Sequence, residues 1–383
     1  MFSENKKISG RQIFRLLTYD LLGIGTLLLP TILAKTTGAD GVFSIFVGLG
    51  IGGCYLVVLG FLLKKMEGDF YDFLRKKCGC FVQKIVLSFF VVYFCLLAGY
   101  TAYLMSCLVL THLLQQGSFL LVLLLLLLLA GYGNVAGIEG RARVYEMLFW
   151  FLMIPFFLML FFGAKDVQTA YWTPVFMGDA GSFWKGTYAV VIWASLLVLL
   201  LFLPPFAKKQ IILVVNTKRA FLFSGGILLV LYLILLGTFG ANALAHMENP
   251  AVVLMSTVQM TGGFLKRVDA FMLGMWFFML YALLNSLLFY GKETLGKIFE
   301  KNRAGADVSQ KGMPGNGKGG YGLRNLISTW SILVITFVVA ICFFRSKNFS
   351  EWYHWFLWWV GTPVLLVMPV LLLPGAGKGE QKR

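Results

Sequence analysis

Long apolar runs constrain this chain more than any other feature of its sequence. One of them reads SFLLVLLLLLLLA at positions 118–130. Hydrophobic residues make up 59% of the 383 residues and charged residues only 13%, whereas a soluble domain is about 25% charged. A globular core cannot bury this much apolar surface. The sequence therefore excludes a soluble enzyme, a secreted disulfide scaffold and a disordered chain, and it predicts an all-α, polytopic membrane protein.

Ten segments are long and apolar enough to be membrane spans, since a spanning helix needs about 20 mostly apolar residues. A further segment, 250–264, is amphipathic and too short to cross, which indicates an interfacial or re-entrant helix at the outer face. The predicted spans are 12–34, 41–63, 84–113, 118–132, 144–163, 186–205, 220–242, 267–290, 324–344 and 352–373.

The basic residues indicate the orientation of these spans. With ten spans, 26 of the 33 Lys and Arg residues fall on one side of the membrane and seven on the other. Because cytoplasmic loops carry the excess of Lys and Arg, both termini are predicted to be cytoplasmic. The excess of Lys and Arg in the cytoplasmic loops of a membrane protein thus explains the net charge of +16, and no nucleic acid partner is expected. At the outer end of the last span, four tryptophans fit an interfacial aromatic belt: Trp352, Trp355, Trp358 and Trp359.

Motifs for catalysis and metal binding fail in their context. GNGKGG at 315–320 matches a dinucleotide-binding pattern, but no strand precedes it and no helix opens at its last glycine. HExxH and GxSxG motifs are absent, and the six cysteines and three histidines are scattered. We therefore expect no catalytic residue, no metal, no cofactor and no enzyme activity.

The first span carries the strongest mechanistic signal. It contains Gly23, Gly25 and Pro30 in mid-membrane, where a weakened helix leaves backbone groups without water. Transporters use such breaks to bind substrate carboxylates at freed N–H groups. The alternative is a kink in which the glycines serve helix packing.

The sixth span repeats this signal. Small residues, Ala194 and Ser195, follow Trp193 in mid-span, and Pro204 and Pro205 end it. Breaks in spans one and six are typical of a five-plus-five inverted repeat. We therefore expect one transmembrane domain over 1–383.

The expected domain divides into two repeats. Residues 1–165 hold the first repeat of five spans. Residues 166–383 hold the second, including a flexible Gly-rich cytoplasmic loop at 300–323.

A ligand at the two breaks would bind through backbone groups and small side chains. Its carboxylate would meet the first span, and its amine would face hydroxyls such as those of Thr26 and Ser195. Tyr100 in span three is a further wall residue, although a bundle tyrosine often serves packing alone. The candidate ligand-binding residues are Gly23, Gly25, Thr26, Tyr100, Trp193, Ala194 and Ser195.

Four segments, in order, resemble the endospore germination permease family, the B-subunit type of germinant receptors. ISGRQIFRLLTYDLLGIGTLLLP at 8–30 resembles the opening of that family, and GIEGRARVYEMLFWFLMIP at 137–155 resembles its segment at span five. YWTPVF at 171–176 is similar to its outer loop, and the stretch at 249–277 to its Phe-Leu-x-Arg segment.

This resemblance implies the amino acid–polyamine–organocation superfamily and a LeuT-like fold. In that fold, spans one and eight meet at the coupling-ion site. Asp20, Asn285 and Ser286 are therefore candidates for ion or proton coupling. The alternative is an Asp20 held neutral, or hydrogen-bonded for structural reasons.

A charged cluster lies at the cytoplasmic end of span five. Glu139, Arg141, Arg143 and Glu146 are expected to form a surface ion-pair cluster, with a gating role as the alternative.

The resemblance implies a sensor in the cell membrane or the spore inner membrane. It would bind a small-molecule germinant, an amino acid by analogy with the superfamily, and work with A-type and C-type receptor subunits. The competing hypothesis is a proton- or sodium-coupled amino-acid permease.

Overall fold

A computed structural model describes residues 7–373, apart from 67, 115, 136, 174, 176–177, 258–267 and 300–317. Over these residues the fold is helical, with a single β-bridge between Ile8 and Ala207. Besides the α-helices there are a 3₁₀ segment, η4 (Ser195–Phe202), and a π-helical turn, η6 (Leu357–Gly361). The α-helices are α1 (Gly10–Thr37), α2 (Gly41–Lys65), α3 (Phe70–His112), α4 (Phe119–Gly133), α5 (Gly137–Gly163), α6 (Ala180–Ala194), α7 (Gln210–His246), α8 (Pro250–Thr257), α9 (Val268–Ile298), α10 (Lys318–Arg345), α11 (Lys347–Phe356) and α12 (Thr362–Leu371). Short 3₁₀ turns are η1 (Gly38–Asp40), η2 (Ala164–Asp166), η3 (Thr169–Trp172) and η5 (Pro204–Phe206).

Eight helical stretches of the described chain are long and apolar enough to cross a membrane. The first, Gly10–Lys65, contains both α1 and α2, and Phe119–Gly133 is a shorter apolar helix. When the first stretch is divided into α1 and α2 and the shorter helix α4 is counted as well, there are ten. The ten predicted spans then correspond to α1–α5, α6 with η4, α7, α9, α10, and α11–α12. The protein is therefore a multi-pass membrane protein. Of the predicted interfacial segment 250–264, α8 covers the beginning, and 258–264 lie outside the described residues.

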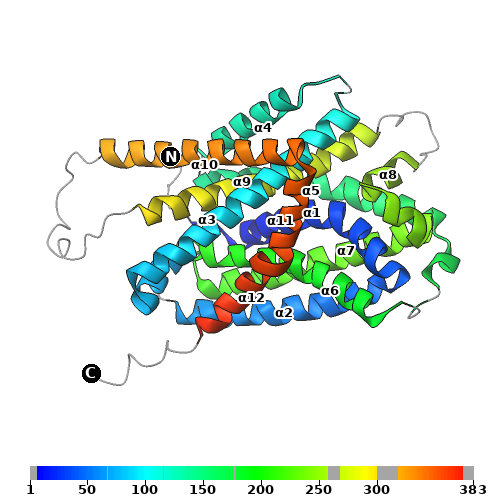
Figure 1. The fold of residues 1–383 in the computed structure, drawn as a ribbon, viewed down its shortest axis with the longest axis horizontal. Helices are drawn as coiled ribbons and strands as arrows, with labels where there is room; N and C mark the ends of the chain where they lie inside the picture. Colours follow the sequence, from blue (N-terminus) through cyan, green and yellow to red (C-terminus); the bar gives the residue numbers. More distant parts are fainter. Residues whose placement is uncertain are drawn as a thin grey trace.

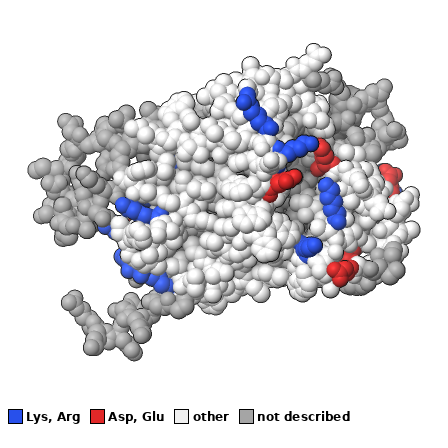
Figure 2. Space-filling model, in the orientation of Figure 1, with Lys and Arg blue, Asp and Glu red and all other residues white. Residues whose placement is uncertain are grey.

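The outer surface of the bundle is apolar where a bilayer would cover it. Large hydrophobic side chains are exposed along α2, α4, α5 and α10. In Figure 2 the charged side chains of the visible face lie toward its two ends, and the band between them is uncharged. Exposed apolar surface on this scale requires a nonaqueous environment.

Helix α1 lies at the centre of the bundle and packs against α5, α6, α7 and α9 (Figure 1). A capping box starts it: Ser9 Oγ accepts from the Gln12 N–H, and Gln12 Oε1 accepts from the Ser9 N–H. It ends at Gly38, whose φ of 56° favours glycine. Between these ends α1 is continuous. The predicted break at Gly23 and Gly25 is therefore wrong for this structure.

Helix α3 begins earlier than the span predicted from hydropathy. Its first part, from Phe70 to Cys78, precedes Gly79, which has a φ of 80°. The polar first part and the apolar second part of α3 therefore meet at a glycine kink.

The sixth span changes helix type at the predicted position. α6 ends at Ala194 and continues directly as the 3₁₀ segment η4 from Ser195. Because 3₁₀ runs longer than about four residues are uncommon, an eight-residue run marks an irregular helix in mid-bundle.

An aromatic cluster fills the bundle where η4 meets α3 and α9. The Phe202 ring lies 5.1 Å from Phe90 and 5.2 Å from Phe94, centroid to centroid. Phe70 and Tyr290 complete it at 5.5 and 5.8 Å from Phe202. All five side chains are buried. We call these five residues the inner aromatic cluster.

The predicted flexible loop 300–323 is only partly described. Residues 318–323 belong to α10, and 300–317 lie outside the described residues.

Candidate functional site

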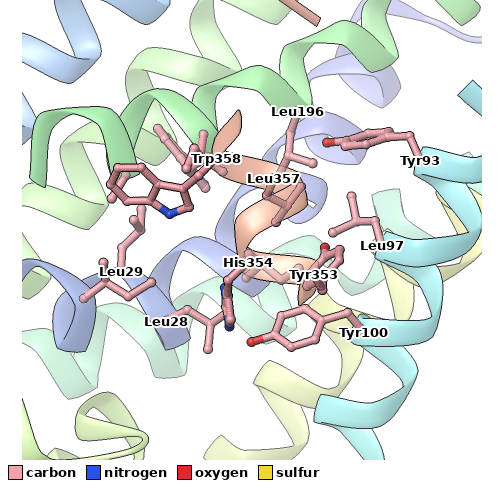
Figure 3. A pocket seen from close by; sticks show the side chains of 15 residues that line it. Leu28, Leu29, Tyr93, Leu97, Tyr100, Leu196, Tyr353, His354, Leu357 and Trp358 are labelled. Atoms are coloured by element: carbon pink, nitrogen blue, oxygen red, sulfur yellow. The ribbon is translucent and has the colours of Figure 1, made fainter. Parts of the chain in front are cut away.

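A cavity of about 100 Å³ lies between α1, α3, α6 and α11 (Figure 3). Tyr93, Leu97 and Tyr100 project into it from α3, facing Tyr353 and His354 from α11. The cavity is mainly aromatic and aliphatic, as small-molecule sites usually are. Its remaining lining residues are Ile24, Leu28, Leu29, Ile32, Ala189, Ile192, Trp193, Leu196, Leu357 and Trp358.

Three polar side chains of the cavity lie where α3 meets α11. The Tyr100 ring lies 5.1 Å from Tyr353 and 6.1 Å from the His354 imidazole. Among the described residues, the buried Tyr353 hydroxyl has no hydrogen-bond partner. Because an unpaired buried hydroxyl is costly, a ligand or a water molecule that reached this group would gain a favourable hydrogen bond.

Trp358 also belongs to this site and not to the outer aromatic belt alone. Its side chain lines the cavity, and its backbone carbonyl accepts a 2.7 Å hydrogen bond from Tyr188 of α6. The turn η6, which contains Trp358, is thereby tied to α6.

Two of the seven predicted ligand-binding residues, Tyr100 and Trp193, line the cavity. The Trp193 indole N–H donates to the Leu21 carbonyl of α1 at 2.8 Å. A Cβ atom added at Gly25 would collide with this indole ring. Gly25 therefore lets α1 and α6 approach closely, and it does not break α1.

The other glycine of α1 also serves close packing. A Cβ at Gly23 would lie 3.1 Å from the backbone of Met279 and Leu280 in α9. Neither Gly23 nor Gly25 lines the cavity. Their backbone N–H groups lie within a continuous helix and are therefore not freed by a break in α1.

Thr26, Ala194 and Ser195 lie beside the cavity without lining it. The Thr26 hydroxyl donates to the Leu22 carbonyl at 2.7 Å and accepts from the Trp276 indole at 3.0 Å. Ser195 donates to the Ile192 carbonyl at 2.6 Å.

A buried polar network connects α1, α5 and α9. The Ser286 hydroxyl donates to Asp20 Oδ1 at 2.7 Å and accepts from Arg141 Nη2 at 3.1 Å. Asp20 is 1% exposed and Arg141 is 4% exposed. The structure thus brings Asp20 and Ser286 together, and it adds the buried guanidinium of Arg141, which was predicted to lie at the surface.

Asn285 extends the network to α4. Arg141 Nη1 donates to the Asn285 carbonyl at 2.7 Å. The Asn285 side chain accepts from Asn134, at the end of α4, at 3.2 Å, and donates to the Tyr145 hydroxyl at 3.3 Å. Asn134 and Tyr145 were missed, although Tyr145 lies only four residues after Arg141.

The rest of the predicted charged cluster forms ion pairs near the surface. Arg143 bonds Glu139, and the Glu146 carboxylate lies 3.3 Å from Arg15 and 3.7 Å from Arg11. In the described part of the chain, no three His, Cys, Asp or Glu residues are grouped to hold a metal ion.

Comparisons with known proteins agree with this architecture. A solved structure of a Na⁺-coupled sialic acid symporter superposes with a TM-score of 0.66 at 11% identity, over 96% of this chain and 80% of the symporter. At this identity the similarity shows the fold, a LeuT-like transporter fold.

Curated relatives come from Bacillus subtilis (strain 168). Spore germination protein YndE is 22% identical over 79% of this chain and 84% of its own length. Spore germination protein B2 is 24% identical over 72% of this chain and 75% of its own, and spore germination protein A2 is 22% identical over 76% and 81%.

A sequence model of the spore permease family, described as "Spore germination protein", matches residues 7–308. That range covers most of the 383 residues and includes α1–α9. The resemblance seen in the sequence is confirmed, and the chain belongs to the spore permease family of spore germination proteins.

Proposed function

We propose that this protein is a nutrient-sensing, permease-like subunit of a spore germinant receptor in the spore inner membrane. The observation that carries the proposal is the cavity between α1, α3, α6 and α11, in a member of a spore germination family with a transporter fold. Tyr100 and Trp193, two of the residues expected to bind ligand, line this cavity.

The chemistry of the cavity favours a small amino acid with an apolar side chain. Leu28, Leu97 and Leu357 offer an apolar surface to the side chain. His354 and the unpaired Tyr353 hydroxyl offer hydrogen bonds to the polar end. In this proposal α11 replaces the first span as the carboxylate-recognising element.

The position of the cavity also suggests how binding becomes a signal. One wall, α1, is held in the centre of the bundle, and the opposite wall, α11 with η6, is joined to α6 through Tyr188 and Trp358. A ligand that contacts both walls stabilises the state in which they are close, and so shifts the population toward it. The shift would be read by A-type and C-type subunits on the same membrane.

A space-filling substitution tests the site. Leu97→Trp fills the cavity from α3, and Val92→Trp places the same side chain on the exposed face of the same helix. In a strain lacking the native copy, spores with Val92→Trp should germinate on amino acids as the parent does. Spores with Leu97→Trp should lose that response while accumulating the protein normally. Equal responses from the two variants would remove the cavity from the proposal.

The Asp20 network favours a second candidate function, a coupled amino-acid permease. Arg141 already bonds the Ser286 hydroxyl that also bonds Asp20. A metal cation here would be repelled by the guanidinium, so the coupled ion would be a proton exchanged at Asp20.

Uptake of labelled amino acids into proteoliposomes separates the two functions. A permease should accumulate substrate when an inward proton gradient is imposed and not when a sodium gradient is imposed. Binding without accumulation under either gradient supports the sensor.

A further inference from the structure

A long groove runs along the outside of the bundle between α5 and α7, away from the cavity described above. It consists of two hollows of about 340 and 580 Å³. Phe157 and Phe223 line both hollows, so the two hollows adjoin each other. The wall of the second hollow is apolar throughout and includes Gly226, beside which a Cβ atom would meet nothing within 4 Å.

One end of this groove is basic. Arg11, Arg15 and Arg219 line the first hollow together with Asn216. Glu146 lies 3.3 Å from Arg15 and 3.7 Å from Arg11. Glu146 therefore pairs with two of the three arginines that line this hollow, and the third, Arg219, is exposed on α7. The end of the groove carries an excess of positive charge.

The dimensions of the groove match one acyl chain below one headgroup. Arg219 at the basic end and Ile234 at the apolar end lie 15 residues apart on α7, which is about 22 Å of helix. Half of a hydrocarbon core is about 15 Å thick. A lipid whose headgroup meets the arginines would therefore have its chain inside the groove along its whole leaflet.

We propose that this groove binds an anionic phospholipid, with its phosphate at Arg11, Arg15 and Arg219 and an acyl chain between α5 and α7. Guanidinium groups suit this role because they bind phosphate bidentately. The excess positive charge favours a lipid with net negative charge over a zwitterionic one. The site is independent of the proposed germinant cavity.

Phe14 gives the site a consequence for the fold. This side chain of α1 lines the first hollow, and its ring lies 5.9 Å from Phe149 of α5 and 5.6 Å from Phe223 of α7. A bound lipid would therefore contact the first turns of the central helix and brace it against α5 and α7.

Two matched pairs of variants test the proposal. Arg219→Gln removes a charge from the groove, and Lys218→Gln removes the same charge from the adjacent exposed position. Gly226→Leu fills the groove, and Gly50→Leu places the same side chain on open surface of α2. The full chain is purified in detergent, stripped of lipid, and titrated with phosphatidylglycerol or phosphatidylcholine under native mass spectrometry.

The parent, Lys218→Gln and Gly50→Leu should each retain one phosphatidylglycerol in preference to phosphatidylcholine. Arg219→Gln should weaken phosphatidylglycerol binding about fivefold, which corresponds to about 1 kcal/mol for one arginine, and leave phosphatidylcholine binding unchanged. Gly226→Leu should reduce binding of both lipids. Equal binding of the two lipids by the parent, or equal losses in Arg219→Gln and Lys218→Gln, would overturn the proposal.

Discussion

Arg141 and Asp20 share one hydroxyl group: Ser286 Oγ accepts from the arginine at 3.1 Å and donates to the carboxylate at 2.7 Å. The two charges come from α5 and α1, and both are buried. Each charge therefore compensates the other inside the bundle. Their pairing fixes α1 against α5 and α9 at the centre of the bundle.

Removing one member of this pair should destabilise the protein strongly. Asp20→Asn keeps an acceptor for Ser286 but leaves Arg141 as an uncompensated buried charge, which costs about 3–5 kcal/mol. Arg141→Gln should have a cost of similar size. Thermal unfolding of the purified protein in detergent measures both.

The double variant supplies the control. Asp20→Asn with Arg141→Gln leaves no unpaired charge. Its loss of stability should therefore be smaller than the sum of the two single losses by about 0.5–3 kcal/mol. Additive losses would mean that Asp20 and Arg141 do not compensate each other.

Gly25 should not tolerate even a methyl group. In Gly25→Ala the new Cβ collides with the Trp193 indole, and overpacking of this kind costs about 1–3 kcal/mol. Because Trp193 lines the cavity, the response to germinant should fall as well. Gly53→Ala is the matched control, since a Cβ there meets nothing within 4 Å. Wild-type stability and germination in Gly25→Ala would contradict the packing that we describe.

Tyr353→Phe should change the stability of the protein and its response to germinant in opposite directions. The change removes a buried hydroxyl that has no partner among the described residues, so the protein should gain about 1 kcal/mol of stability. If the hydroxyl bonds the ligand, the concentration of amino acid needed for germination should rise. A more stable protein with an unchanged response would exclude Tyr353 from ligand binding.

The proposed orientation can be checked by cysteine labelling. Lys35 and Lys76 are both exposed, and the predicted topology places Lys35 outside and Lys76 in the cytoplasm. In a background without native cysteines, Lys35→Cys should react with an impermeant maleimide on intact cells. Lys76→Cys should react only after permeabilisation, and its labelling on intact cells would reject the ten-span topology.

The sequence predicted those features that follow from local composition. Spans were found because 20 apolar residues have few alternatives, and Asp20 was expected to have a polar partner because a carboxylate in a span needs one. Ser286 was found only through the family resemblance. The change of helix type at Ser195 followed from small residues and prolines within one span.

Other features depend on partners far away in the chain, and the sequence alone misses them. Arg141 precedes the predicted fifth span by three residues and was placed at the surface, but its partner Ser286 is 145 positions away. Gly25 was read as a break because the Trp193 ring that packs on it belongs to another helix. Tyr353 and His354 were overlooked because α11 was treated as the outer end of a span.

The inner aromatic cluster sets a limit on leakage. Phe70, Phe90, Phe94, Phe202 and Tyr290 come from α3, η4 and α9 and pack ring against ring. A continuous path for solute past them would require several large side chains to leave their positions together, and the loss of each would forfeit the burial of roughly 150–250 Å². Events that need such concerted rearrangement are rare compared with the motion of one side chain. This part of the bundle should therefore stay closed to solutes and ions unless the helices that carry the cluster move.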